Sequence, residues 1–81
     1  MKVEVKLFAR ARDVAGADTV SVEVPDSAKV ADLRAALALM FPELEPLVPN
    51  LLVAVDNQYA DDETTLDDST EIACFPPVSG G

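Results

Sequence analysis

The residues with the clearest chemical potential are the last two, Gly80 and Gly81, in a chain that has only three glycines. At an average glycine usage of about 7%, two adjacent terminal glycines arise by chance in roughly 0.5% of chains, which favours a functional interpretation. Because glycines carry no side chain, they can pass through a narrow channel and bring a terminal carboxyl group into a buried active site. Attack at that carbonyl carbon would meet no Cβ atom.

A carboxylate becomes reactive only after activation, for example by ATP, which converts it into an acyl adenylate with AMP as the leaving group. A nucleophile that delivers sulfur then produces a C-terminal thiocarboxylate. Pro76 and Pro77 favour a stiff, extended conformation that projects the end of the chain away from the body. We therefore expect residues 76–81 to form a working tail that needs no catalytic side chains from the rest of the chain.

The composition excludes several classes of function. Fifteen Asp and Glu residues against six Lys and Arg residues give a net charge of −9, which repels phosphate backbones and anionic lipids. We expect no nucleic-acid or membrane partner, and a basic cleft on another protein fits better. With no His and one Cys, the chain alone builds neither the usual nitrogen and sulfur metal sites nor a Ser-His or Cys-His pair. We expect no metal site and no catalysis by the chain on its own.

Cysteine usage and hydropathy point to one compartment. The single Cys74 forms no internal disulfide and fits a reducing environment. No apolar run approaches the roughly 18–20 residues that span a bilayer, and the N-terminus alternates charge and hydrophobe, unlike a secretory signal. We expect a cytoplasmic protein.

The hydrophobic pattern predicts four strands and one helix. Two segments alternate with period two, and one segment repeats at helical spacing before Pro42 ends it. Residues 9–18 read as a loop, and Pro25, Asp26 and Ser27 offer side chains that could cap the helix. The expected elements are strands at 2–7, 19–24, 51–55 and 71–75 and a helix at 30–40.

The third strand, 51–55, is apolar without alternation, so it is expected to be covered on both faces or to be a short buried element. The order β-β-α-β-β leaves one main helix to cover one face of a mixed sheet. This predicts an α+β fold of the β-grasp (ubiquitin-like) class. The expected organisation is a domain over residues 1–75 and an extended tail over 76–81.

Several motifs resemble those of a known family, the small subunits of molybdopterin synthase, which are ubiquitin-like sulfur carriers. The resemblance spans the whole chain, and its ending is its most specific part. The matching pieces are Leu7-Phe8-Ala9 with Arg12 and Gly16, Val30-Ala31-Asp32-Leu33, Leu52-Val53-Ala54-Val55 and Phe75-Pro76-Pro77-Val78-Ser79-Gly80-Gly81. The turn at 56–58 departs from the pattern, since many relatives have a glycine there.

This resemblance implies a function for the tail. Gly81 would be adenylated by a partner related to ubiquitin-activating enzymes, which uses ATP, and then converted to the thiocarboxylate. The chain itself would bind no cofactor. The tail would insert into the large, catalytic subunit of molybdopterin synthase, where sulfur passes to cyclic pyranopterin monophosphate. The tail residues implied for insertion are Pro76, Pro77, Val78, Ser79 and Gly80.

Three aromatic residues, Phe8, Tyr59 and Phe75, are candidates for one exposed contact patch, because aromatic anchors concentrate binding energy at interfaces. Phe8 falls on the polar side of the first strand, and the resemblance places all three at partner interfaces. The competing interpretation is that each caps the small core, which applies most to Tyr59.

The remaining charged and sulfur-bearing residues have weaker signals. Arg12 matches the family pattern and is a further interface candidate, whereas Arg10 reads as a solvated charge. The acidic run 61–68 lacks the glycine and glutamate spacing of a calcium loop and reads as a solvated connection. Cys74 reads as a small buried strand residue and a weak acceptor of sulfur.

Three alternatives stay open. A carrier for thiazole or cysteine synthesis would keep the chemistry and change the acceptor. A ubiquitin-like protein modifier would form isopeptide bonds through Gly81. A plain interaction domain would make no use of the two glycines.

Overall fold

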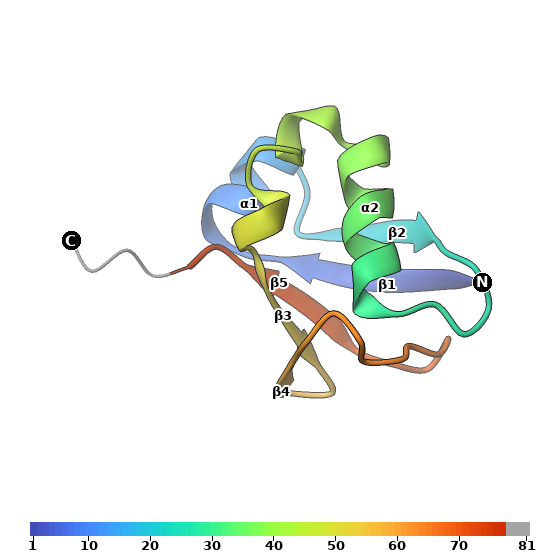
Figure 1. Ribbon diagram of the computed structural model, residues 1–81. Coiled ribbons are helices and arrows are strands. Elements are labelled where there is room, and N and C mark those ends of the chain that lie inside the picture. Colours follow the sequence, from blue (N-terminus) through green and yellow to red (C-terminus); the bar gives the residue numbers. More distant parts are fainter. Residues whose placement is uncertain (78–81) are drawn as a thin grey trace.

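The computed structural model describes residues 1–77, and these form one five-stranded mixed sheet with helices on one side (Figure 1). The sheet order is β2-β1-β5-β3-β4, in which β1 and β5 are parallel and the other neighbours are antiparallel. The elements are β1 (Lys2–Leu7), α1 (Ala9–Ala15), β2 (Thr19–Glu23), α2 (Val30–Met40), the short 3-10 turns η1 (Pro42–Leu44) and η2 (Val48–Asn50), β3 (Leu52–Val55), β4 (Gln58–Ala60) and β5 (Ile72–Phe75). The predicted α+β β-grasp class is confirmed.

The core lies between α2 and the inner face of the sheet. Alternate residues of β1 are buried, as the period-two pattern predicts, and Leu33 and Leu37 of α2 are fully buried against them. No charged or polar residue is buried among the described residues. The apolar side chains facing α2 from the sheet include Val3, Val5, Leu7, Val20, Val22, Val53, Ile72 and Cys74.

The first and second strands and the main helix were predicted closely, and the connection between the strands was not. Residues 9–15 form helix α1 instead of a loop, with Ala11 fully buried and Gly16 ending the helix at φ 77°. The run ARARDVA supplies helix-forming alanines, and the glycine adopts the left-handed conformation that closes the last turn. The loop interpretation missed this glycine stop signal.

The second half of the sheet also differs from expectation. Strand β3 is not covered on both faces, since Leu52 is 40% exposed while Val53 is buried. A short strand β4 follows a two-residue turn in which Asp56 and Asn57 have φ of 50° and 70°. Positive φ at both central residues is the geometry of tight hairpins, and Asp and Asn tolerate it without glycine. The last strand begins at Ile72, one residue later than predicted.

The start of α2 is stabilised by the acidic segment rather than by residues 25–27. The backbone N–H groups of Val30 and Ala31 donate to the carbonyls of Thr64 and Asp62 at 2.9 and 3.1 Å. Asp32 also accepts a bond from the Lys29 N–H at 2.8 Å. The first turn of a helix has N–H groups without partners inside the helix, and here another segment of the chain supplies them. The predicted capping role of Pro25, Asp26 and Ser27 was therefore wrong.

Arg34 joins three parts of the fold. Its Nε donates to Asp62 at 2.7 Å, and its Nη1 donates to the carbonyl of Val48 at 2.6 Å. Its side chain is only 20% exposed, so these bonds are less screened than those of a surface pair. The guanidinium thus ties α2 to η2 and to the acidic segment.

We predict that Arg34→Met lowers the free energy of unfolding by about 1–3 kcal/mol, because the carbonyl of Val48 loses its donor. Urea unfolding followed by circular dichroism measures this. Arg10→Met is the matched control, since Arg10 is exposed and forms no ion pair within residues 1–77. An equal effect of both substitutions would show that Arg34 contributes only through net charge.

Candidate functional site

The face of the sheet away from α2 carries a row of aligned side chains. The register pairs Lys6 with Ala73, Ala73 with Ala54, and Ala54 with Tyr59, so these four residues cross β1, β5, β3 and β4 on one face. Residues opposite each other on neighbouring strands project to the same side. The two central residues are alanines, which leave the middle of the face shallow between larger neighbours.

A groove of about 360 Å³ lies along this row. We call it the aromatic groove. Phe8, Tyr59 and Phe75 provide its large apolar side chains, Ala54 and Ala73 lie between them, and Lys6, Asn57, Glu71 and Ile72 complete the lining. The three predicted aromatic residues therefore meet at one site. Tyr59 is 76% exposed, so the alternative that it caps the core was wrong.

The aromatic pair at one end of the groove is fixed by stacking. The rings of Phe8 and Phe75 lie nearly parallel, with centroids 4.8 Å apart and an interplanar angle of 13°. Phe8 lies just beyond β1, at the residue before α1, and lines the groove together with Lys6, on the polar side of the strand as predicted. The following Ala9 has φ 52°, so a strained backbone residue turns the chain next to Phe8. The Phe8–Phe75 stack spans the first and last strands.

Arg12 lies beside the groove rather than in it. It lines a neighbouring depression together with Phe8 and Asp18. Its Nε is 3.7 Å from a carboxylate oxygen of Asp13 and 3.7 Å from one of Asp18. Half of its side chain is exposed. A contact of Arg12 with a partner stays a prediction, and it would compete with these two ion pairs.

The tail begins at the groove. Phe75 is both the last residue of β5 and part of the groove, and Pro76 and Pro77 follow it without regular secondary structure. The predicted chemical residues Val78, Ser79, Gly80 and Gly81 lie outside the described residues. The boundary between domain and tail at residue 75 stays a prediction.

Sequence reasoning missed Lys6, Ala54, Asn57 and Ala73 as lining residues. Alternation in the first strand does place Lys6 on the polar face, so that residue was within reach. The two alanines could be recognised only with the strand register, which depends on contacts between β5, β3 and β1.

The acidic run forms an ordered connection. Asp61 accepts bonds from the Glu63 N–H and the Thr64 hydroxyl at 3.0 and 3.2 Å, and Leu66 is buried. Bonds from the Ser69 hydroxyl and N–H lower the pKa of Asp67. Within residues 1–77, no three His, Cys, Asp or Glu side chains gather as a metal site would require, and no helix has the length and hydropathy to span a membrane.

Cys74 is fully buried on the inner face of β5, opposite Val53 and Leu7. Burial raises the pKa of its thiol to about 11 from 9.0, because the apolar core disfavours the thiolate. The thiolate is the nucleophilic form. The prediction of a small buried residue is confirmed, and the folded chain offers no reactive cysteine among residues 1–77.

We predict that the free energy of unfolding falls as the pH rises from 9 to 11, in part because of Cys74. The unfolded thiol loses its proton from about pH 9.0, whereas the folded thiol keeps it up to about 11. The unfolded state then binds fewer protons, so stability decreases with pH in this window. Urea unfolding at pH 8, 9.5 and 10.5 measures the slope, and Cys74→Ala should reduce it. An unchanged slope in that variant would contradict the assigned cause.

Together the fold and the groove define a small β-grasp protein with an aromatic groove beside the end of its last strand. Residues 5–81 match the family described as the ThiS family. A relative from Chlamydomonas reinhardtii, named molybdopterin synthase sulfur carrier subunit, is 34% identical over the full length of both chains. One of the same name from Arabidopsis thaliana is 31% identical, covering all of this chain and 84% of that protein. The chain therefore belongs to the ThiS family of sulfur carriers.

Solved structures agree with this assignment. Small archaeal modifier protein 1 from Haloferax volcanii is 34% identical with a TM-score of 0.85, covering 95% of this chain and 98% of that one. A putative molybdopterin converting factor, subunit 1, from Pyrococcus furiosus is 30% identical with a TM-score of 0.84, covering 96% and 99%. A complex of subunits 1 and 2 of molybdopterin-converting factor from Helicobacter pylori, 24% identical with a TM-score of 0.69 and covering all of both chains, shows the shared fold.

Proposed function

We propose that this chain is the sulfur-carrier small subunit of molybdopterin synthase. An adenylating enzyme of the ubiquitin-activating type uses ATP to convert the Gly81 carboxylate into an acyl adenylate, and sulfur then replaces AMP to give the thiocarboxylate. The large synthase subunit takes up the tail and transfers the sulfur to cyclic pyranopterin monophosphate. The observation that carries the proposal is full-length similarity to proteins named as this subunit, together with the Gly80-Gly81 ending.

The residues of the chain support a reaction in which the catalytic groups lie on the large subunit. It has no histidine, and its only thiol is buried with a raised pKa. In the proposed reaction the reacting group is the C-terminal carbonyl carbon, and the partner supplies the general acids and bases. The carrier contributes the C-terminal tail that holds the sulfur and a surface that the partner binds.

The aromatic groove supports this arrangement, because it lies where the tail begins. A partner that binds the Phe8–Phe75 stack also receives the chain as it leaves β5 at Pro76. Binding energy from the groove would then hold the terminal carbonyl in an active site several residues away, which is how remote contacts assist a reaction.

A second candidate is a protein modifier, which the similarity to small archaeal modifier protein 1 favours. The activated Gly81 carbonyl would then be attacked by a lysine amine, with loss of AMP and formation of an isopeptide bond. Both functions use the same activated carboxyl, so they differ only in the nucleophile.

We predict that the chain, incubated with its adenylating enzyme, ATP and a sulfur source, gains the mass difference between sulfur and oxygen at Gly81. Intact-protein mass spectrometry followed by fragmentation measures this. Deletion of Gly80 and Gly81 is the control and should abolish the change. No mass change in the wild-type chain would contradict sulfur carriage, and a lysine conjugate without a thiocarboxylate would favour the modifier.

We also predict that Tyr59→Ser weakens binding to the large subunit about tenfold or more while the free energy of unfolding stays within about 0.5 kcal/mol, because the ring is largely exposed. Isothermal titration calorimetry and urea unfolding measure the two quantities. Phe75→Ala should lower both, since that ring also stacks on Phe8. Unchanged affinity of Tyr59→Ser would remove β4 from the interface.

A further inference from the structure

The largest exposed apolar side chains of the described residues fall into two groups. Phe8, Leu52 and Tyr59 belong to strands or strand ends on the groove side of the sheet. Leu39 and Met40, which are 84% and 47% exposed, lie at the C-terminal end of α2, on the other side. Phe8 and Tyr59 line the aromatic groove, and Leu52 is paired with Phe75 of that groove. The second group has no role in the proposed function.

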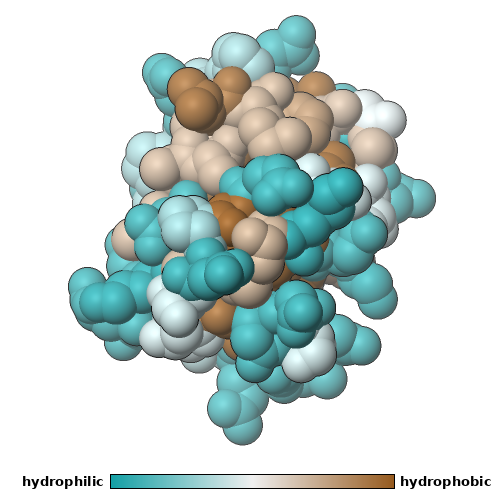
Figure 2. Space-filling model, turned by 90° about the vertical axis from the view of Figure 1, so that its right-hand side faces the viewer, coloured by the Kyte–Doolittle hydropathy of each residue, from teal (hydrophilic) through white to brown (hydrophobic). Residues whose placement is uncertain are grey.

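The end of α2 continues into a small groove. A depression of about 200 Å³ lies between α1 and the α2–η1 junction. We define the α2-end surface as the apolar lining of this depression with the neighbouring Leu39, namely Val14, Ala15, Leu39, Met40, Phe41 and Pro42. Figure 2 shows an apolar area over the upper part of the molecule, where the C-terminal half of α2 lies in Figure 1.

The sequence of this surface is unusual for an exposed helix end. Residues 35–42 contain no charged side chain, in a chain that has 21, from 15 acidic and 6 basic residues. An exposed end of a helix normally carries polar residues on its solvent side. Contiguous apolar surface on a small soluble fold marks a contact site more often than chance.

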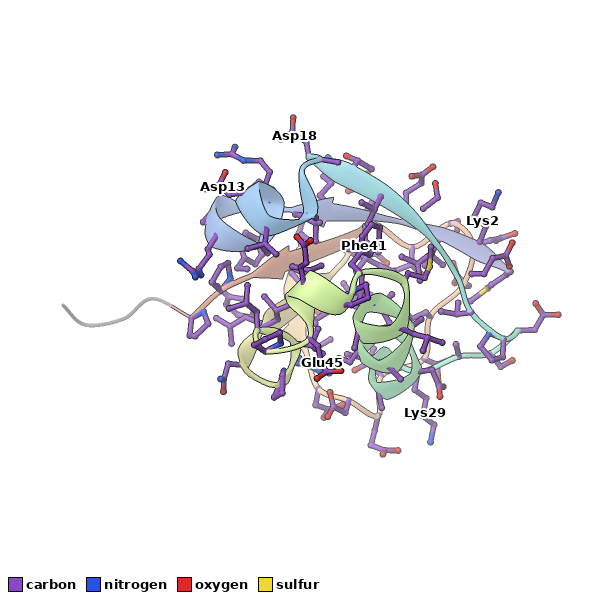
Figure 3. The ribbon with its side chains drawn as sticks, turned by 90° about the horizontal axis from the view of Figure 1, so that it is seen from above. Lys2, Asp13, Asp18, Lys29, Phe41 and Glu45 are labelled. Atoms are coloured by element: carbon purple, nitrogen blue, oxygen red, sulfur yellow. The ribbon has the colours of Figure 1, made fainter. Side chains whose placement is uncertain are left out.

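Carboxylates lie at the α2-end surface and on the elements next to it. Glu43 lines the depression, and Figure 3 shows Asp13 on α1 and Glu45 at the end of η1. Arg12 lies on the adjoining helix α1, and its guanidinium already forms ion pairs with Asp13 and Asp18. The surface is therefore an apolar patch in an acidic frame, which fits a protein that presents an apolar side chain among lysines or arginines.

The same charge disfavours a second copy of this chain as the occupant. Two copies would bring net charges of −9 together and place acidic frames against each other, which costs free energy at moderate salt. The occupant must be a different, basic protein.

We propose that the α2-end surface binds a basic sulfur-donor protein while the aromatic groove and tail are held by the adenylating enzyme. This inference rests on the proposed function. In this proposal sulfur reaches the adenylated tail while that enzyme occupies the groove face, so a donor that contacts the carrier does so at a surface away from the groove. The α2-end surface is apolar, lies on the other side of the sheet and has the complementary charge.

The chemistry allows docking to be separated from reaction. With a protein persulfide, the terminal sulfur attacks the acyl carbon, AMP leaves and an acyl disulfide forms. A dithiol reductant then cleaves that disulfide to the thiocarboxylate and the donor's cysteine thiol. With inorganic hydrosulfide, the sulfur attacks the same carbon, AMP leaves, and no protein has to dock.

The test compares Leu39→Glu with Ala31→Glu in loading by adenylating enzyme and ATP, using either a persulfide-bearing sulfurtransferase, with dithiothreitol added only after the reaction is quenched, or sodium sulfide alone. Ala31 is also exposed on α2 but lies two turns away, so it controls for the added charge. We expect Leu39→Glu to raise the KM for the sulfurtransferase about fivefold or more, the loss typical of an interface residue worth about 1 kcal/mol. Loading from sulfide and the behaviour of Ala31→Glu should match the wild type.

Glu43→Lys tests the charge, and it should raise the KM for the sulfurtransferase and flatten its dependence on salt. Equal KM values for Leu39→Glu and wild type would overturn the inference while leaving the proposed function intact. Slower loading from sulfide would also overturn it, because the surface would then serve the adenylating enzyme. A wild-type dimer that Leu39→Glu dissociates, seen by light scattering, would assign the surface to a second copy. Absence of loading from either sulfur source in the wild type would count against the proposed function itself.

Discussion

The parallel pairing of β1 with β5 determines where every functional feature lies. Val5 faces Ile72, Lys6 faces Ala73 and Leu7 faces Cys74 in the centre of the sheet. This register buries Ile72 and Cys74 with the core and turns Ala73 outward. A slip of one residue would exchange the two faces, burying Lys6 and exposing the core. The same register places the residue after β1, Phe8, against the last residue of β5.

Long connections make that central pairing costly to form. Each residue of β1 is paired with the residue of β5 that lies 67 positions later, as Val5 with Ile72 shows, so closing this pair costs loop entropy. Arg34 and the acidic segment contribute here, because they fix the chain just before β5 to α2 and η2. The residues that read as a solvated acidic connection thus hold the helix and the last strand in their relative positions. The backbone carbonyls of Thr64 and Asp62 accept hydrogen bonds from N–H groups at the start of α2 that would otherwise lack partners.

The sequence patterns predicted the strands and the helix whose formation depends on residues close together in the chain. The alternation in β1, the helical repeat of α2 with its stop at Pro42, and the relative order of β1, β2, α2, β3 and β5 each follow from spacing along the chain, whereas α1 and β4 were not predicted. Helix α1 was missed because a seven-residue helix gives little periodicity, although Gly16 marked its end. The shallow alanine centre of the groove could not be predicted, because it requires knowing which strands are neighbours. The meeting of Phe8, Tyr59 and Phe75 was expected from the resemblance, and the register explains it physically.

In the proposed function, recognition by partners is separated from the chemical step. A reacting carbonyl at the end of a tail has few contacts of its own, so specificity has to come from the rigid body to which the tail is joined. The aromatic groove meets this requirement because its Phe8–Phe75 stack belongs to the two strands at the centre of the sheet, which are among the best supported elements. Its partner therefore receives the tail from a fixed origin. The α2-end surface lies on the side of the sheet that α2 covers, so a protein bound there need not contact a protein bound at the aromatic groove.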